Sequence, residues 1–239
     1  VDAAADPVPV LERLSRRTGE YVFGIRRDGM TFLGASPELL MAKRGRDLRT
    51  EALAGTCRID RLDDRSAGLT VAAERLFGSG KDLEEHALVV RGIVDALEPL
   101  SSRQVLPAWP AVRALKDLAH LCSEIEVELK DGVGPVTVLR ALHPTPAVGG
   151  LPRDAALRFL SATEPVERGW YAGPVGWFTS AGDAELAVGI RSALLAGKVA
   201  YLYAGAGIVR ASDPEAEYLE TEDKLGRLSS ALGVNEIPE

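Results

Sequence analysis

The chain has 239 residues, of which 46% are hydrophobic and 26% charged, a composition typical of a soluble globular protein. With 28 Lys and Arg against 35 Asp and Glu, its net charge is −7, which argues against nucleic acid or an anionic membrane as the main partner. No apolar run is long enough to span a bilayer, and the acidic first residues do not resemble a signal peptide. Because an initiator Met is missing, we expect the chain to begin inside a longer protein.

The two cysteines predict neither a metal site nor a dense disulfide framework. Cys57 and Cys122 form no ligand spacing of the Cys/His type. We expect free thiols in a cytoplasmic protein, although the sequence leaves one disulfide open.

The first half of the chain predicts a short helix, a series of strands and a long helical region. The short helix covers residues 8–17. The helical region covers about 62–98, where apolar residues recur at helical spacing. These apolar residues are Leu83, Ala87, Val90, Val94 and Leu97. Between the two helical regions, Asp-Gly and Gly turns separate four strand-like segments: YVFGIRR, MTFLGAS, ELLMAKRG and LRTEALAG.

The second half mixes short helices with strands. Residues 101–110 predict a Pro-containing connection, 112–121 a short helix and 123–130 a strand. Helices are predicted over 136–142 and 153–163, on either side of the loop HPTPAVGGLP. Three strands follow, GPVGWFTSA, ELAVGIRSALLAG and KVAYLYAGAG, and a tight hairpin at Ala196-Gly197 joins the last two. Antiparallel runs with inserted helices predict an α+β fold, and no boundary divides residues 1–239 into more than one domain.

A Gly-rich turn and an acidic helix follow, in AGAGIVRASDPEAEYLETEDKL. Asp213 is a good helix N-cap, and Pro214 suits the first helical position. Glu217, Glu220 and Lys224 then lie at i, i+3 and i+7, so they share one face. Most acidic helix faces are simply solvated. Two carboxylates and a lysine beside an open backbone turn also fit a divalent metal and an anionic substrate.

Glu38 and Arg191 are polar residues at apolar positions. Glu38, in GASPELL, opens an apolar strand; if it is buried there, its pKa is raised and it suits a general acid. A strand edge exposed to water is the alternative. Arg191 lies within an apolar strand and needs a carboxylate partner, either a substrate or an internal glutamate.

Two histidines and two helical glutamates remain ambiguous from their pattern. Glu84, Glu85 and His86 lie on the predicted long helix, and their spacing favours a solvated face. His143 lies in the Pro-rich loop, where a single histidine is more often structural than catalytic.

Seven segments, collinear from about residue 30 onward, together resemble one family, the chorismate-utilising enzymes. This family includes isochorismate synthase, salicylate synthase and the large component of anthranilate synthase. The segments are GASPELL, EALAGTCR, GSGKDLEEHALVV, LHPTPAVGGLPRDAA, EPVERGWYAGPVGW, IRSALL and YAGAGIVRASDPEAEYLETEDKL. The resemblance implies a chorismate-utilising fold of two stacked, largely antiparallel sheets flanked by helices.

The resemblance also implies roles for single residues. Glu38 is similar to the general acid that protonates the departing C4 hydroxyl of chorismate, and His143 to a pocket histidine near the ring, so the resemblance implies a catalytic role for both. The implied cofactor is Mg²⁺, held directly or through water by Glu85, Glu217 and Glu220, and hard oxygen ligands suit this ion. The implied substrate-binding positions are Ala147, Tyr171, Arg191, Gly205 through its backbone amide, and Lys224.

Within the family, the loop after His143 is most similar to the isochorismate synthase of menaquinone biosynthesis. Salicylate-forming relatives tend to carry Thr where Ala147 stands, and anthranilate synthases usually show a Thr-Ser-Gly type pattern. The implied reaction adds water at C2 of chorismate and expels the C4 hydroxyl. The alternatives are a salicylate synthase-type lyase and a non-catalytic chorismate-binding fragment. A menaquinone or a siderophore pathway, and a homodimer, both stay open.

One family feature is missing from the sequence. Relatives that add water carry a general-base lysine on a strand shortly before the segment that matches residues 1–15, whereas no lysine here precedes Lys43. We therefore expect a C-terminal portion of an isochorismate synthase, without the N-terminal strands and the base. Loss of a positioned base lowers turnover by roughly 10²–10⁴-fold.

Overall fold

The computed structural model describes residues 6–16, 19–59, 65–115 and 117–233. Its strands are β1 Tyr21–Arg27, β2 Met30–Ser36, β3 Leu39–Arg44, β4 Asp47–Arg58, β5 Ser101–Val105, β6 Ala111–Ala114, β7 Leu118–Leu129, β8 Pro174–Phe178, β9 Ala184–Val188, β10 Ser192–Ala196 and β11 Val199–Tyr203. Its α-helices are α1 Pro7–Ser15, α2 Arg65–Gly78, α3 Gly80–Leu97, α4 Pro135–Leu142, α5 Pro146–Gly149, α6 Arg153–Thr163 and α7 Pro214–Leu232.

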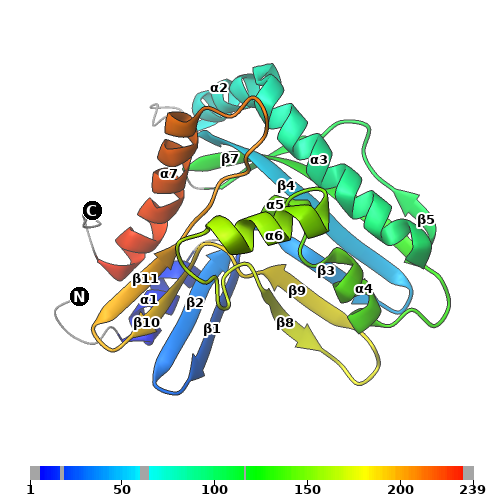
Figure 1. Cartoon of the computed structure of the whole chain (residues 1–239), viewed down its shortest axis with the longest axis horizontal. Coiled ribbons are helices and arrows are strands. Elements are labelled where there is room, and N and C mark those ends of the chain that lie inside the picture. The colour runs from blue at the N-terminus through cyan, green and yellow to red at the C-terminus, as the bar shows by residue number, and fades with distance from the viewer. Residues whose placement is uncertain (1–5, 17–18, 60–64, 116, 234–239) are drawn as a thin grey trace.

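Two antiparallel sheets form the framework, which confirms the predicted α+β fold (Figure 1). The smaller sheet has the strand order β1-β2-β10-β11, and the larger has the order β5-β7-β4-β3-β9-β8, with β6 also paired to β7. Helices α1 and α7 pack against the smaller sheet, whereas α3 and α4 cover the larger one (Figure 1). No helix within the described ranges has the length and apolarity needed to cross a membrane.

Helix α3 supplies the main contact with the larger sheet, but through a different stripe from the one predicted. Its buried residues are His86, Val89, Ile93 and Leu97, which pack on one face at intervals of three or four. Of the five apolar residues that define the predicted stripe, only Leu97 is fully buried. The buried stripe therefore includes a histidine, which the apolar pattern alone does not reveal.

Three local predictions are wrong. Residues 112–121, predicted as a helix, form β6 and the start of β7, and the predicted connection 101–110 contains β5. Residues 118–123 are buried without interruption, so the strand reads as a continuous apolar run rather than an alternating one. The predicted strand at 185–197 is two strands, β9 and β10, which belong to different sheets. The hairpin at Ala196-Gly197 is confirmed between β10 and β11.

The chain crosses between the two sheets twice, at adjacent places. Strand β2 continues through Pro37 and Glu38 into β3, and β9 continues through residues 189–191 into β10. Backbone hydrogen bonds join the crossings: the Val188 amide donates to the Glu38 carbonyl at 3.1 Å, and the Ala35 amide donates to the Arg191 carbonyl at 3.2 Å. Glu38 and Arg191 therefore lie together where the sheets meet.

Candidate active site

A cavity of about 500 Å³ opens where the two sheets meet. Its walls come from both crossings, the adjoining part of β4, helices α3, α5 and α6, and the loop at 204–209. Seven of the predicted site residues line it: Glu38, Glu85, Ala147, Tyr171, Arg191, Gly205 and Lys224. The fold thus brings together residues that are up to 186 positions apart in sequence, Glu38 and Lys224 being the extremes.

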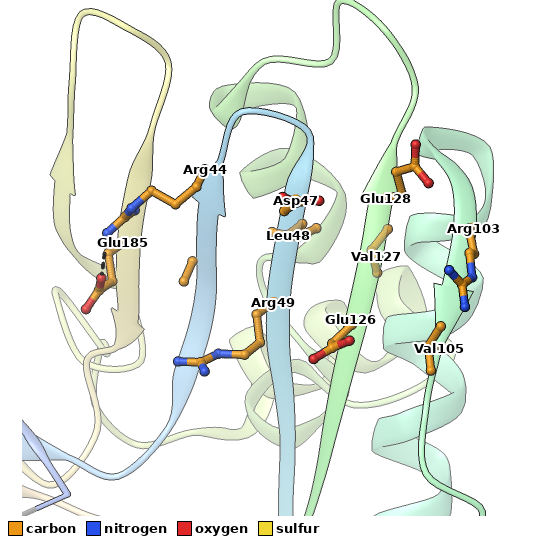
Figure 2. Close-up of a pocket in the computed structure, with 11 residues that line it drawn as sticks. Arg44, Asp47, Leu48, Arg49, Arg103, Val105, Glu126, Val127, Glu128 and Glu185 are labelled. Carbon is orange, nitrogen blue, oxygen red and sulfur yellow. Dashed lines mark hydrogen bonds and ion pairs between the residues drawn. The ribbon is translucent and has the colours of Figure 1, made fainter.

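A second hollow, of about 540 Å³, lies on the charged outer face of the larger sheet (Figure 2). Arg44 and Glu185 form an ion pair of 3.1 Å there, and Arg49 and Glu126 project from neighbouring strands. Its charged side chains are largely exposed, and none of the predicted site residues lines it. We therefore place the candidate active site in the smaller cavity, where the ionisable groups are buried.

The Glu38 carboxyl is a buried acid that faces this cavity. The residue is 2% exposed, so the alternative of a water-exposed strand edge is wrong. Its Oε1 atom has no hydrogen-bond partner within the described part of the chain. Burial and then the charge of Glu51 raise the pKa of Glu38 to about 8, against the opposing effects of Lys224 and Arg191. At neutral pH the carboxyl is therefore mainly protonated and able to donate a proton.

Arg191 is oriented by a histidine that the sequence analysis did not select. Nη2 of Arg191 lies 3.4 Å from Nε2 of His120, and Nδ1 of His120 lies 3.1 Å from the Gly55 carbonyl. A neutral ring that donates from Nδ1 to Gly55 leaves Nε2 to accept from the guanidinium. His120 also lines the cavity. The predicted helix over 112–121 gives His120 no special position, and the uninterrupted burial of residues 118–123 on β7 leaves no alternating pattern that would single it out.

Tyr171 and Gly205 form a tightly packed part of the wall. The Tyr171 ring stacks on Tyr203 with ring centroids 5.3 Å apart, and burial raises the pKa of the Tyr171 hydroxyl. A Cβ atom on Gly205 would lie 3.0 Å from that hydroxyl oxygen. Glycine at 205 therefore keeps the backbone of the loop close to the tyrosine.

Three predicted carboxylates converge on one ammonium group, that of Lys81. Its Nζ lies 3.2 Å from Glu85 Oε2, 3.0 Å from Glu217 Oε1 and 3.8 Å from Glu220 Oε2. Asp82 Oδ1 is a fourth neighbour at 3.6 Å. Helices α3 and α7 thus meet through a cluster of charges that are largely removed from water.

Lys224 connects this cluster to the cavity. Its Nζ donates to Glu220 Oε1 at 2.5 Å and to the Gly205 carbonyl at 2.9 Å. Burial lowers the pKa of Lys224, against the effect of Glu220. Glu217 and Glu220 themselves do not line the cavity; Glu217 pairs with Lys81 and Glu220 with Lys224.

The carboxylate cluster fits a hard cation by its donor chemistry. No group of three or more His, Cys, Asp or Glu in the described ranges is already arranged to hold a metal ion. However, Oε2 of Glu85 and Oε2 of Glu217 are buried without a hydrogen bond, the 3.2 Å contact of Glu85 with Lys81 being an ion pair only. Carboxylate oxygens are the ligands that Mg²⁺ prefers, and a cation would satisfy both atoms.

The neighbours of Glu85 on α3 have different environments. Glu84 is exposed, whereas His86 is buried, with Nε2 2.9 Å from Ser123 Oγ. Burial lowers the pKa of His86 to about 4, so this histidine is neutral and structural. Glu85 alone of the three lines the cavity.

His143 does not line the cavity. Its carbonyl accepts a hydrogen bond from Arg153, and the residue lies half-buried between α4 and α5, the short helix that carries Ala147. His143 thus lies outside the lining of the cavity, which His120 reaches.

The chain is similar over most of its length to proteins of one known family. The profile described as "Chorismate binding enzyme" matches residues 1–233. The chain is 42% identical over 238 residues to the salicylate biosynthesis isochorismate synthase of Pseudomonas aeruginosa, covering 98% of this chain and 49% of the relative. It is 40% identical over 228 residues to isochorismate synthase MenF of Bacillus subtilis, covering 94% and 47%.

Solved structures of related enzymes have a similar fold. MenF, the menaquinone-specific isochorismate synthase from Escherichia coli, superposes with a TM-score of 0.87 at 37% identity, over 96% of this chain and 53% of that one. Anthranilate synthase component I from Streptococcus pneumoniae has a TM-score of 0.80 at 26% identity, over 95% and 49%. The chain spans about half the length of these relatives.

Proposed function

Since this chain belongs to the chorismate-binding enzymes, we propose that it carries the acid, the substrate-binding groups and the metal ligands of an isochorismate synthase. The proposed reaction is the Mg²⁺-dependent isomerisation of chorismate to isochorismate, by water addition at C2 and loss of the C4 hydroxyl. The observation that carries this proposal is a buried, protonated Glu38 in a cavity that it shares with the cations Arg191 and Lys224.

Glu38 is the proposed general acid. Hydroxide is a poor leaving group, and transfer of the Glu38 proton to the C4 oxygen allows it to depart as water. A carboxyl with a pKa of about 8 holds this proton at neutral pH. The carboxylate left behind is stabilised by the charges of Arg191 and Lys224, both of which lower its pKa. The acid can therefore keep its proton before the reaction and lose it during the reaction.

The cationic and polar groups of the cavity are the proposed binding groups for the two carboxylates of chorismate. Arg191 presents a guanidinium held by His120, and Lys224 an ammonium held by Glu220. Tyr171 and the Gly205 backbone lie beside them. The small side chain of Ala147 leaves room for the ring. A local concentration of positive charge thus offsets the overall charge of −7.

Glu85, Glu217 and Glu220 are the proposed holders of Mg²⁺, which when bound supplies positive charge to a substrate carboxylate. The buried Oε2 atoms of Glu85 and Glu217, which have no hydrogen bond in the described part of the chain, support this assignment. Glu85 lines the cavity and lies closest to the substrate space of the three.

No described lysine is placed to activate water. Lys43 donates from Nζ to the carbonyls of Gly45 and Gly182 and does not line the cavity. Among the described lysines only Lys224 lines it, and Lys224 is bound to Glu220 and Gly205. We propose that this site binds chorismate but, without a positioned base, turns it over roughly 10²–10⁴-fold more slowly than an isochorismate synthase that has one. Turnover at the rate of a complete enzyme would contradict this.

Calorimetry of chorismate binding, with and without Mg²⁺, tests the site. We expect binding that requires Mg²⁺ and that Glu220→Ala abolishes. The matched control is Glu222→Ala, an exposed position on the same helix, which leaves binding unchanged. Binding that is insensitive to Mg²⁺ and to Glu220→Ala would refute the assignment. A coupled lactate dehydrogenase assay separates the isomerase from a lyase, because only the lyase releases pyruvate.

A further inference from the structure

We propose that Lys81 is an internal counter-ion of the carboxylate cluster, which it holds together until Mg²⁺ displaces it. The site would then have two alternative occupants, the ammonium of Lys81 and the divalent cation. This inference rests on the Mg²⁺ site of the proposed function, and it assigns to Lys81 a positioning role.

The location of Lys81 on its helix is unfavourable on local grounds. Helix α3 begins at Gly80, and Ser79 caps it by accepting a hydrogen bond from the Asp82 amide at 3.2 Å. Lys81 is thus the second residue of the helix. The positive end of the helix dipole lies there and disfavours a cation. Compensation comes from the carboxylates around it, so the position of this lysine is explained by the cluster rather than by the helix.

Lys81 binds the same groups as the proposed metal. Its ion pairs reach Glu85 and Glu217 at 3.2 and 3.0 Å, and Glu220 at 3.8 Å. Mg²⁺ takes its oxygen ligands at about 2.0–2.1 Å and needs near-octahedral geometry, so it must enter among these same carboxylates. A divalent ion there would repel the ammonium strongly, since both would lie in a region largely removed from water. The two cations therefore compete.

The lysine is more able to move than the carboxylate opposite it. A Cβ atom placed on Gly207 would lie 2.1 Å from Glu85 Oε1, so the backbone of the loop at 204–209 stands directly against this carboxylate. By contrast, the Lys81 side chain is 19% exposed, against 12% for Glu85. The long, flexible stem of Lys81 can thus carry the ammonium into water while Glu85 stays in place.

Calorimetric titration with MgCl₂ alone, in the absence of chorismate, tests the competition. Lys81→Met keeps the apolar stem and removes the charge. We expect it to bind Mg²⁺ roughly tenfold or more tightly than the unsubstituted chain, because no cation has to leave. The control is Arg91→Met, which removes a positive charge from the exposed face of the same helix and leaves Mg²⁺ affinity unchanged.

Thermal unfolding gives a second reading of the same variants. Without metal, Lys81→Met should melt at a lower temperature than the unsubstituted chain, since its carboxylates repel each other. Added Mg²⁺ should raise the melting temperature of Lys81→Met by more than it raises that of the unsubstituted chain. Equal or weaker Mg²⁺ binding by Lys81→Met, with unchanged melting, would overturn the role of Lys81. Absence of Mg²⁺ binding by both proteins would overturn the metal site itself, and this inference with it.

The unsubstituted chain can be tested too, in case Lys81→Met does not fold. Acylation of lysines, mapped by mass spectrometry, should label Lys81 faster when Mg²⁺ is added, because the ammonium moves into water. Lys130, whose exposed Nζ donates to the Pro99 carbonyl, serves as the internal reference. Slower or unchanged labelling of Lys81 in a chain that calorimetry shows to bind Mg²⁺ would contradict displacement.

Discussion

Glu38 and Arg191 lie on the two antiparallel crossings between the sheets, and the backbone hydrogen-bonds each crossing to the other. Burial raises the pKa of the Glu38 carboxyl, and the Arg191 charge opposes that rise. Arg191 adopts a φ of +50°, a left-handed conformation uncommon for a side chain of this size. This geometry sets the acid beside a cation without forming an ion pair that would hold the acid in its ionised form.

Replacement of Glu38 with Gln should change how stability depends on pH. The pKa of Glu38 rises from 4.5 in the unfolded chain to about 8 in the folded one, so the folded state binds the proton more tightly. This stabilisation is fully present below about pH 4.5 and is lost as the pH rises through about 8. We expect Glu38→Gln to gain stability relative to the unsubstituted chain between pH 5 and pH 9, as measured by urea unfolding. Glu126→Gln, on the exposed sheet face, is the control; parallel pH profiles for all three proteins would contradict the buried acid.

Glu51 should tune the acid. Its charge is the second cause, after burial, of the raised pKa of Glu38, while Lys224 and Arg191 lower that pKa. Glu51 is held by Arg113 through two hydrogen bonds of 2.6 and 2.8 Å. Glu51→Gln removes a negative charge and leaves Arg113 with only the exposed Glu124 carboxylate, 3.7 Å away, as its ionic partner, and both effects lower the pKa of Glu38.

The expected result for Glu51→Gln is a shift of the alkaline limb of kcat/KM to lower pH, since Glu38 then ionises earlier. The limb is measured from initial rates of isochorismate formation between pH 6 and pH 10. A merely structural role for Glu51 would lower the rates without moving the alkaline limb. A limb that stays at the same pH would therefore contradict the electrostatic effect of Glu51 on Glu38.

A side chain at position 207 should disturb the Glu85 carboxylate. A Cβ atom there would meet Glu85 Oε1 at 2.1 Å, so Gly207→Ala must displace the carboxylate or the loop. We expect a loss of about 1–3 kcal/mol in unfolding free energy, as for other overpacked sites, together with weaker Mg²⁺ binding.

The matched comparison is Gly226→Ala on α7, where nothing lies within 4 Å of the added atom. Alanine in a helix interior should raise stability there by roughly 0.5–1 kcal/mol. If both variants behave alike in chemical denaturation and in Mg²⁺ titration, close packing of Gly207 on Glu85 is refuted.

The roles of His120 and His143 can be distinguished by replacing each with alanine. His120→Ala removes the group next to the Arg191 guanidinium and should weaken chorismate binding about tenfold, the loss of one hydrogen bond to a charged group. His143→Ala should affect stability more than binding, because this residue does not line the cavity. Calorimetry and thermal unfolding of both variants check this; the reverse order would restore the predicted catalytic role of His143.

The acidic C-terminal helix shows what local patterns can establish. Asp213 caps α7 by accepting a hydrogen bond from the Ala216 amide at 3.0 Å, and Pro214 is the first helical residue, both as predicted. The shared face of Glu217, Glu220 and Lys224 is confirmed by their common contacts around Lys81 and Gly205. Capping and helical spacing depend on a few adjacent residues, which is why they could be read directly.

Lys81 and His120 show what such patterns miss. Lys81 is part of the cluster only because α3 and α7 meet, and this contact spans more than 130 residues of sequence. His120 lies on a strand buried on both faces, where alternation of polar and apolar residues disappears. In both cases the deciding information is which elements pack together, and no local window of sequence contains it.

The double crossing at the junction couples the shape of the protein to its chemistry. A rotation of one sheet against the other would move Glu38 relative to Arg191. Because the Arg191 charge lowers the pKa of Glu38, that pKa would change with the relative position of the sheets. The amides of Val188 and Ala35 are the donors that span the junction, and their exchange with deuterium would record how often it opens.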